Sequence, residues 1–313
     1  MLPYFPFGNE FDHRMGTALL RPDETLVEVD EHYPTEIARK RALLTQDHRY
    51  YFRARPGTEP AQWDVLERLL TEAATHYPDH FSLTQNGPDW HWQNHLLNED
   101  QHFTFGQPDT LPLAPLDWVG RQVQEDLLIL SAEEGAALVA GQLCFPNGWC
   151  LDDKFGQTFL GIHKPAPDAV QPTLQAAQKL LERIPTHRPV WRASWNFKIT
   201  DQLDLSTRYS ASYNDDLSQR APGMAADTIG DQLFIRIERQ TFTKLPRSGA
   251  ILFGIHTYQN LLAHEAFRYD RARRMLNTLR TTPRDMLTYK AIAPFERPLL
   301  EFLEQQVANG IGL

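Results

Sequence analysis

The order of apolar patterns between residues 126 and 258 restricts the possible folds of this chain more than any other feature. Two short apolar runs separated by AEEG come first, followed by irregular turns, one amphipathic stretch and three further runs of strand character. Apolar residues alternate in half-buried strands and recur every three or four residues in helices. The expected strands are 126–131, 137–145, 189–197, 232–242 and 249–258, and the expected helix is 170–184. We therefore predict an α+β fold, in which an antiparallel sheet carries helices on one face.

The regions on either side of this block have helical and loop patterns. PTEIARKRALL (34–44) and AQWDVLERLLTEAATHY (61–77) have apolar residues at helical spacing, and the chain returns to helix after Gln259. Residues 100–117 are rich in proline and have little periodicity, which is typical of a loop. We expect an N-terminal helical and loop region at 1–118, a sheet domain at 119–262 and a C-terminal helical extension at 263–313, the two outer segments wrapping the sheet.

Two other segments interrupt the strand pattern. The polar stretch 200–231 reads as a long loop, and long loops inside compact domains are often functional or face a partner. In CFPNGWC the PNG triplet predicts a hairpin turn, which would bring Cys144 and Cys150 close together across two strands. A zinc site or an iron–sulfur cluster needs about four ligands, so we expect two reduced thiols.

Charge and composition exclude several classes of function. The formal net charge of −9 argues against a general nucleic-acid-binding protein, and the arginine-rich stretch 268–280 reads as the solvated face of a helix. We find no secretory signal and no apolar run near the roughly 18 residues that a membrane helix needs, so we expect a cytoplasmic protein. The GxGxxG, GxxxxGK[ST] and GxSxG fingerprints are missing.

The segment DWHWQNHLLNEDQHF contains a cluster of histidines. His91 and His95 are four residues apart, which would place both imidazoles on one face of a helix, and Glu99 and His102 follow. Metalloprotease chemistry needs a glutamate directly after the first histidine, where this chain has Trp92. We expect structural or surface roles for these histidines.

The succession of elements after residue 126 resembles that of the PAS domain. In PAS domains a strand–turn–strand unit leads into a proline-bearing corner before a long helix, and KFGQTFLGIHKPAPD is similar to that corner. His163 lies in the corner, followed by Pro165 and Pro167, which restrict the backbone. Two interpretations remain open for His163: a hydrogen-bonded turn residue, or an axial ligand of haem iron at the edge of a PAS-like cavity.

The strand FIRIERQTF carries charges on both faces. Alternation places Arg236, Glu238 and Gln240 on one face, and Arg239 on the other. A charge inside a sheet is costly unless it is paired, so we expect either an internal ion pair or a bound polar ligand. Arg192, His256 and Tyr258 lie on the neighbouring expected strands, and we predict that they converge with Glu238 in a polar pocket, although a purely structural network is the alternative.

Several longer segments resemble one protein family. LCFPNGWCLDDKFGQTFLGIHKPAP, VWRASWNF and above all IERQTFTKLPRSGAILFGIHTY are similar to the α subunit of the haem-dependent oxidative N-demethylases, as are PFGNEFDHRMG and DEHYPTEIARKRALL. The resemblance implies a PAS-like fold that binds haem b. It also implies oxidation of a small secondary amine such as dimethylamine by O₂, with electrons from NADPH through partner subunits that carry FMN, a 2Fe–2S cluster and a tetrahydrofolate site.

The same resemblance implies roles for individual residues. His163 becomes the metal ligand, and Arg192 and Glu238 become catalytic residues that polarise O₂ and hold the substrate ammonium. Lys154 is expected to meet a haem propionate. The weaker assignments are Tyr258 as a catalytic residue and Arg239 and His256 as haem-binding residues.

Two other functions are compatible with the sequence. One is a haem sensor or carrier with the same fold and no turnover, and the other is a haem-free scaffold that docks partners through residues 200–230. If His163 is not the iron ligand, His187 is the next histidine to consider.

Overall fold

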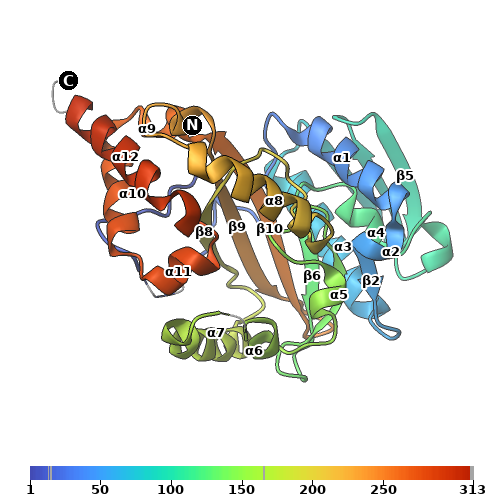
Figure 1. The fold of residues 1–313 in the computed structure, drawn as a ribbon. Coiled ribbons are helices and arrows are strands. Elements are labelled where there is room, and N and C mark those ends of the chain that lie inside the picture. The colour runs from blue at the N-terminus through green and yellow to red at the C-terminus, as the bar shows by residue number, and fades with distance from the viewer. Residues whose placement is uncertain (13, 15, 165, 311–313) are drawn as a thin grey trace.

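A seven-stranded antiparallel sheet forms the centre of the molecule in the computed structural model, which describes residues 1–12, 14, 16–164 and 166–310 (Figure 1). The strand order is β1-β8-β9-β10-β6-β7-β2. The strands are β1 Ala18–Leu19, β2 Phe52–Ala54, β6 Asp126–Leu130, β7 Leu138–Gln142, β8 Val190–Lys198, β9 Phe234–Lys244 and β10 Ile251–Leu261. The five strands and the antiparallel pairing predicted between residues 126 and 258 are confirmed.

Helices surround this sheet, and α7 is the helix expected at 170–184. The helices are α1 Tyr33–Gln46, α2 His48–Tyr51, α3 Glu59–His76, α4 Pro115–Gly120, α5 Leu151–Lys154, α6 Phe159–Ile162, α7 Gln171–Arg183, α8 Ser210–Arg220, α9 Leu262–Ala266, α10 Tyr269–Thr281, α11 Arg284–Tyr289 and α12 Glu296–Gly310. Within the described ranges, no helix combines the length and the apolar character needed to cross a membrane.

Alternate residues of β6 show how the two faces of the sheet are covered. Leu128 belongs to a buried cluster with Leu174 and Leu181 of α7, whereas Leu127 belongs to one with Leu66 and Leu69 of α3. Figure 1 shows α6 and α7 below the sheet, the N-terminal helices at one end and α10–α12 at the other. The face that carries Leu128 is the one on which the candidate cavity lies.

The N-terminal third differs from its expected structure. Residues 81–104 form a second, three-stranded sheet made of β3 Phe81–Asn86, β4 Asp89–Asn94 and β5 Glu99–Thr104. The helix expected for His91 and His95 is therefore wrong. The loop expected from residue 100 is wrong in its first part, because residues 100–104 belong to β5. Alternation explains the strands, because Trp90 and Trp92 are buried while His91 is only partly covered.

Two further expectations about loops are also wrong. Residues 200–231 are not one long loop, because they contain α8 and the short 3₁₀ segments η3 Thr207–Tyr209, η4 Ala221–Gly223 and η5 Ile229–Asp231. CFPNGWC does not form a hairpin, since β7 ends at Gln142 and the Asp126 carboxylate accepts hydrogen bonds from the amides of Cys144 and Phe145. Both cysteines are free thiols, as expected, and both are buried.

Candidate functional site

A cavity of about 850 Å³ lies against the face of β8 and β9 that carries Arg192 and Glu238. Register explains their common face, because Arg192 pairs with Gln240 and Ser194 pairs with Glu238. Other walls come from the N-terminal segment, α7, α8 and α11. The volume lies within the range of about 300–1,000 Å³ that is typical of small-molecule and cofactor sites.

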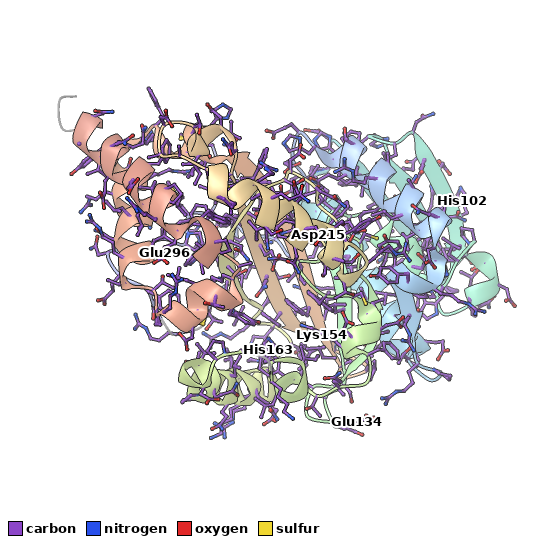
Figure 2. All side chains as sticks on the ribbon, in the orientation of Figure 1. His102, Glu134, Lys154, His163, Asp215 and Glu296 are labelled. Atoms are coloured by element: carbon purple, nitrogen blue, oxygen red, sulfur yellow. The ribbon has the colours of Figure 1, made fainter. Side chains whose placement is uncertain are left out.

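Four of the predicted site residues line this cavity: Lys154, His163, Arg192 and Glu238. Figure 2 labels Lys154 and His163 close together at the lower end of the sheet. Lys154 ends α5, and His163 directly follows α6. The prediction that Arg192 and Glu238 converge is confirmed.

The imidazole of His163 is held by the end of the short helix that precedes it. Its Nδ1 lies 2.8 Å from the carbonyl oxygen of Phe159, an acceptor that the last turn of a helix leaves open. Nδ1 therefore carries the proton and donates it, and Nε2 keeps a free lone pair. Burial lowers the pKa of His163, and the charges of Lys154 and Arg192 act in the same direction. His163 is thus a neutral, oriented imidazole at a cavity wall. Pro165, which the sequence suggested as a restraint, lies outside the described residues.

Cationic side chains gather around the cavity. Burial lowers the pKa of Lys154, whose Nζ lies 4.5 Å from the centre of the Trp149 ring. Burial also lowers the pKa of Arg192, and the carboxylate of Glu238 opposes that shift. Burial leaves both charges poorly solvated, and an anionic ligand would stabilise them.

Two lysines that sequence reasoning missed, Lys198 and Lys290, also line the cavity. Burial, with a contribution from Arg236, lowers the pKa of Lys198 to about 7. Burial likewise lowers the pKa of Lys290 to about 8, and its Nζ donates to the carbonyl of Trp195 at 2.7 Å. Lys198 follows Arg192 at an even spacing on β8, so alternation along the strand was a usable signal. Lys290 comes from the C-terminal region, and nothing in its local sequence indicates the cavity.

Glu238 is held in place from both sides along the sheet. Its Oε2 accepts hydrogen bonds from Gln240 at 3.1 Å and from Ser194 at 3.5 Å, and its Oε1 lies 3.5 Å from Nε of Arg236. Arg236 is 1% exposed and also donates to the carbonyls of Leu203 and Phe145. An internal ion pair, one of the two expected explanations for charge in this strand, is therefore present.

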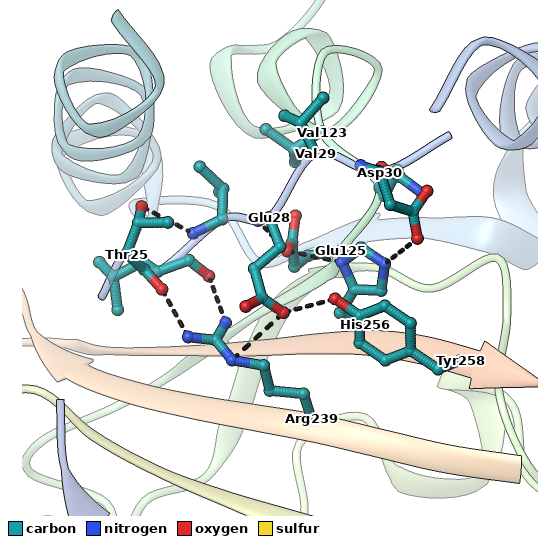
Figure 3. A network of polar contacts seen from close by, with 12 residues as sticks. Thr25, Glu28, Val29, Asp30, Val123, Glu125, Arg239, His256 and Tyr258 are labelled. Atoms are coloured by element: carbon teal, nitrogen blue, oxygen red, sulfur yellow. Dashed lines mark hydrogen bonds and ion pairs between the residues drawn. The ribbon is translucent and has the colours of Figure 1, made fainter. Parts of the chain in front are cut away.

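Arg239, His256 and Tyr258 belong to a different buried network on the opposite face of the sheet (Figure 3). His256 pairs with Arg239 across the strands and Tyr258 pairs with Ile237, so alternation places both away from Glu238. Arg239 donates to the carbonyl of Thr25 at 2.6 Å and lies 3.4 Å from Glu28, which also accepts from the Tyr258 hydroxyl. The predicted convergence of His256 and Tyr258 with Glu238 is wrong.

His256 is the charged centre of this second network. Its Nδ1 lies 2.9 Å from Glu125 and its Nε2 lies 3.7 Å from Asp30. Burial opposes protonation, but the carboxylates of Glu125 and Asp30 outweigh it and raise the pKa of His256 to about 10. Glu125 in turn accepts from the backbone of Glu28, so the network ties the N-terminal segment to the sheet.

Comparison with known families agrees with the resemblance seen in the sequence. Residues 19–300 match the model of the family described as haem-dependent oxidative N-demethylase, alpha subunit-like. The chain belongs to this family. The description indicates an oxidative enzyme that depends on haem, and it indicates a subunit of a larger assembly.

The residues at the cavity of this N-demethylase-like chain fit a haem group. Haem iron needs a ligand atom with a free lone pair, and Nε2 of His163 supplies one beside a cavity of sufficient size. Haem b also carries two propionates, and the lysines and arginine around the cavity are the groups that would bind carboxylates. His187, by contrast, is exposed and lies outside the cavity lining.

Proposed function

We propose that this chain is the haem-binding monooxygenase subunit that catalyses oxidative N-demethylation of a small secondary amine such as dimethylamine. The observation that carries the proposal is His163, whose Nδ1 is fixed by the Phe159 carbonyl so that Nε2 is the free nitrogen at the cavity. The overall reaction balances as amine, O₂, two electrons and two protons giving the demethylated amine, formaldehyde and water.

Haem supplies the redox-active iron that activates O₂. In this proposal His163 would bind the iron, and Lys154 would pair with a propionate. The helix-capping hydrogen bond fixes the imidazole tautomer and ring direction, as partners of metal-binding histidines commonly do.

Glu238 holds the substrate amine in this proposal. A protonated amine that enters a buried site needs an opposite charge, and Glu238 is the carboxylate that the sheet contributes beside Arg192. Ser194, Gln240 and Arg236 fix the carboxylate, so its direction toward the amine is set before the substrate binds. Arg192, which lines the same cavity, would supply a positive charge that polarises O₂.

The wider assembly is part of the same proposal. Residues 119–262 would form a PAS-like haem domain, with 1–118 and 263–313 as flanking segments. Electrons would come from a separate NADPH-dependent reductase whose subunits carry FMN, a 2Fe–2S cluster and a tetrahydrofolate site. The description of the family as an alpha subunit supports a multi-subunit enzyme.

Absorption spectra of the haem-loaded protein test the proposal. We expect His163→Ala to lose the proposed imidazole ligand and shift the Soret band, whereas His187→Ala, which changes an exposed histidine, leaves the spectrum as in the wild type. Unchanged ligation in His163→Ala would refute the assignment. Protein that shows no Soret band after haem supplementation would refute haem binding altogether.

A titration with dimethylamine separates the enzyme from a haem sensor. We expect the amine to perturb the wild-type spectrum, Glu238→Gln to abolish the response and Glu182→Gln, on the exposed surface of α7, to retain it. With a chemical electron donor and O₂, formaldehyde should appear in the wild type. A well-loaded protein that responds to no amine and forms no formaldehyde would favour the sensor.

A further inference from the structure

Two histidines and an aspartate meet on the outer face of the small sheet, away from the cavity. His91 of β4 lies directly opposite His102 of β5, and Asp100 lies two residues before His102, on the same face. The two imidazole rings are stacked, with their centres 3.8 Å apart and their planes 8° from parallel. Figure 2 labels His102 at the edge of the molecule, far from His163.

The ligand atoms of these three side chains converge. Oδ1 of Asp100 lies 2.9 Å from Nε2 of His91 and 3.7 Å from Nε2 of His102, and the three groups offer ligand atoms that all lie within 4.8 Å of one another. Zinc bonds of about 2.0–2.1 Å in a tetrahedral site place neighbouring ligand atoms about 3.3 Å apart. Small side-chain rotations therefore suffice, and the His102 side chain, which is 74% exposed, has room to make them.

A second layer of hydrogen bonds orients the carboxylate. Gln93 donates through Nε2 to Oδ2 of Asp100 at 3.0 Å, and its own Oε1 accepts from Ser82 at 2.9 Å. Oδ2 is thereby directed toward Gln93, and Oδ1 faces both imidazoles. Such outer partners are typical of metal sites, where they fix the direction of the ligating group.

A simple ion pair explains this arrangement less well. Asp100 can neutralise one imidazolium, but two imidazoles stacked at 3.8 Å would repel each other if both were charged. Both rings nevertheless direct Nε2 toward the same carboxylate oxygen, Oδ1 of Asp100, at 2.9 and 3.7 Å. A divalent cation would accept a lone pair from each of the three groups at once. The two strands are anchored on their inner face, where Trp90, Trp92 and Phe103 are buried.

We propose that His91, Asp100 and His102 bind a divalent transition-metal ion of the Zn²⁺ class, with a fourth coordination position open to solvent. Two imidazoles and one carboxylate are ligands that zinc accepts, and three protein ligands leave one position for water or for a group from another molecule. The ion would join β4 to β5 across the exposed side of the small sheet.

Isothermal titration of the whole haem-loaded chain with Zn²⁺ tests the site. We expect His91→Ala and His102→Ala each to weaken one binding event at least tenfold, and Gln93→Leu to weaken it about 10–100-fold through the lost orientation of Asp100. His95→Ala is the matched control, because His95 is exposed in the same segment but outside the cluster, and its titration should equal that of the wild type. Equal Zn²⁺ affinity and stoichiometry in wild type and His102→Ala would overturn the proposal.

Discussion

Glu238 and Arg239 are neighbours in the sequence, yet their side chains lie on opposite faces of the central sheet and each pairs with a charge on its own face. Glu238 lies 3.5 Å from Arg236 at the cavity, whereas Arg239 lies 3.4 Å from Glu28 beneath the N-terminal segment. One strand therefore supports both the candidate site and the network that attaches the N-terminal segment. A change in either residue acts on a different part of the molecule.

Of the residues around the candidate site, Arg236 is the one whose replacement should lower the stability of the fold most. Arg236→Met leaves the carbonyls of Leu203 and Phe145 without their donor and removes the partner of Glu238. Removing one member of a buried ion pair costs about 3–5 kcal/mol. Urea unfolding should show a free energy of unfolding about 3 kcal/mol below that of the wild type. This value is at the lower end of the range because Ser194 and Gln240 still bind Glu238.

Two further variants separate this effect from general damage. Arg297→Met removes an arginine whose side chain is 89% exposed, and its free energy of unfolding should stay close to that of the wild type. Combining Arg236→Met with Glu238→Gln should recover part of the lost stability, because the uncompensated carboxylate is gone. A double variant no more stable than Arg236→Met would contradict the role assigned to the ion pair.

The periodicity of single segments predicted most of the central sheet. Strand β9 was expected at 232–242 and lies at Phe234–Lys244, and alternation along it correctly placed Glu238 and Arg239 on opposite faces. The carbonyl partners of Arg236 could not be predicted in this way, because they belong to residues 145 and 203, which are far away along the chain. The same limitation hid Lys290, which reaches the cavity from the C-terminal region.

Cross-strand register caused the main error at the site. Tyr258 and His256 were expected beside Glu238 because they lie on an adjacent strand, but the residue opposite Glu238 is Thr257. A shift of one residue moves a side chain to the other face, and sequence patterns do not fix register to that accuracy. The histidines of residues 91–102 were misread for a related reason, since their spacing fits both a helix and two paired strands.

Lys154 should contribute to haem affinity without affecting iron ligation. If its buried ammonium pairs with a propionate, a charge-assisted bond of about 1.5–3 kcal/mol is lost in Lys154→Met, and haem affinity falls about 10–100-fold. The Soret position should stay that of the wild type, because His163 is intact. Titration of the haem-free protein with haem measures both quantities. Lys179→Met, at an exposed position on α7, is the control, and equal affinity in the two variants would contradict the assignment.

His256 should make stability depend on pH in the alkaline range. Glu125, Asp30 and Glu36 face its ring and raise its pKa to about 10, above the ordinary value of 6.5. Its protonated form therefore stabilises the fold fully below about pH 6.5, and this contribution is lost as pH rises toward 10. His256→Gln removes the charge, so the gap in unfolding free energy between wild type and variant should shrink by up to about 1.4 kcal/mol per pH unit between pH 7 and 9. Urea unfolding at pH 6, 7, 8 and 9 measures this gap, with His187→Gln, which changes an exposed histidine, as the control variant. A gap that stays constant over this range would mean that His256 is neutral in the folded protein.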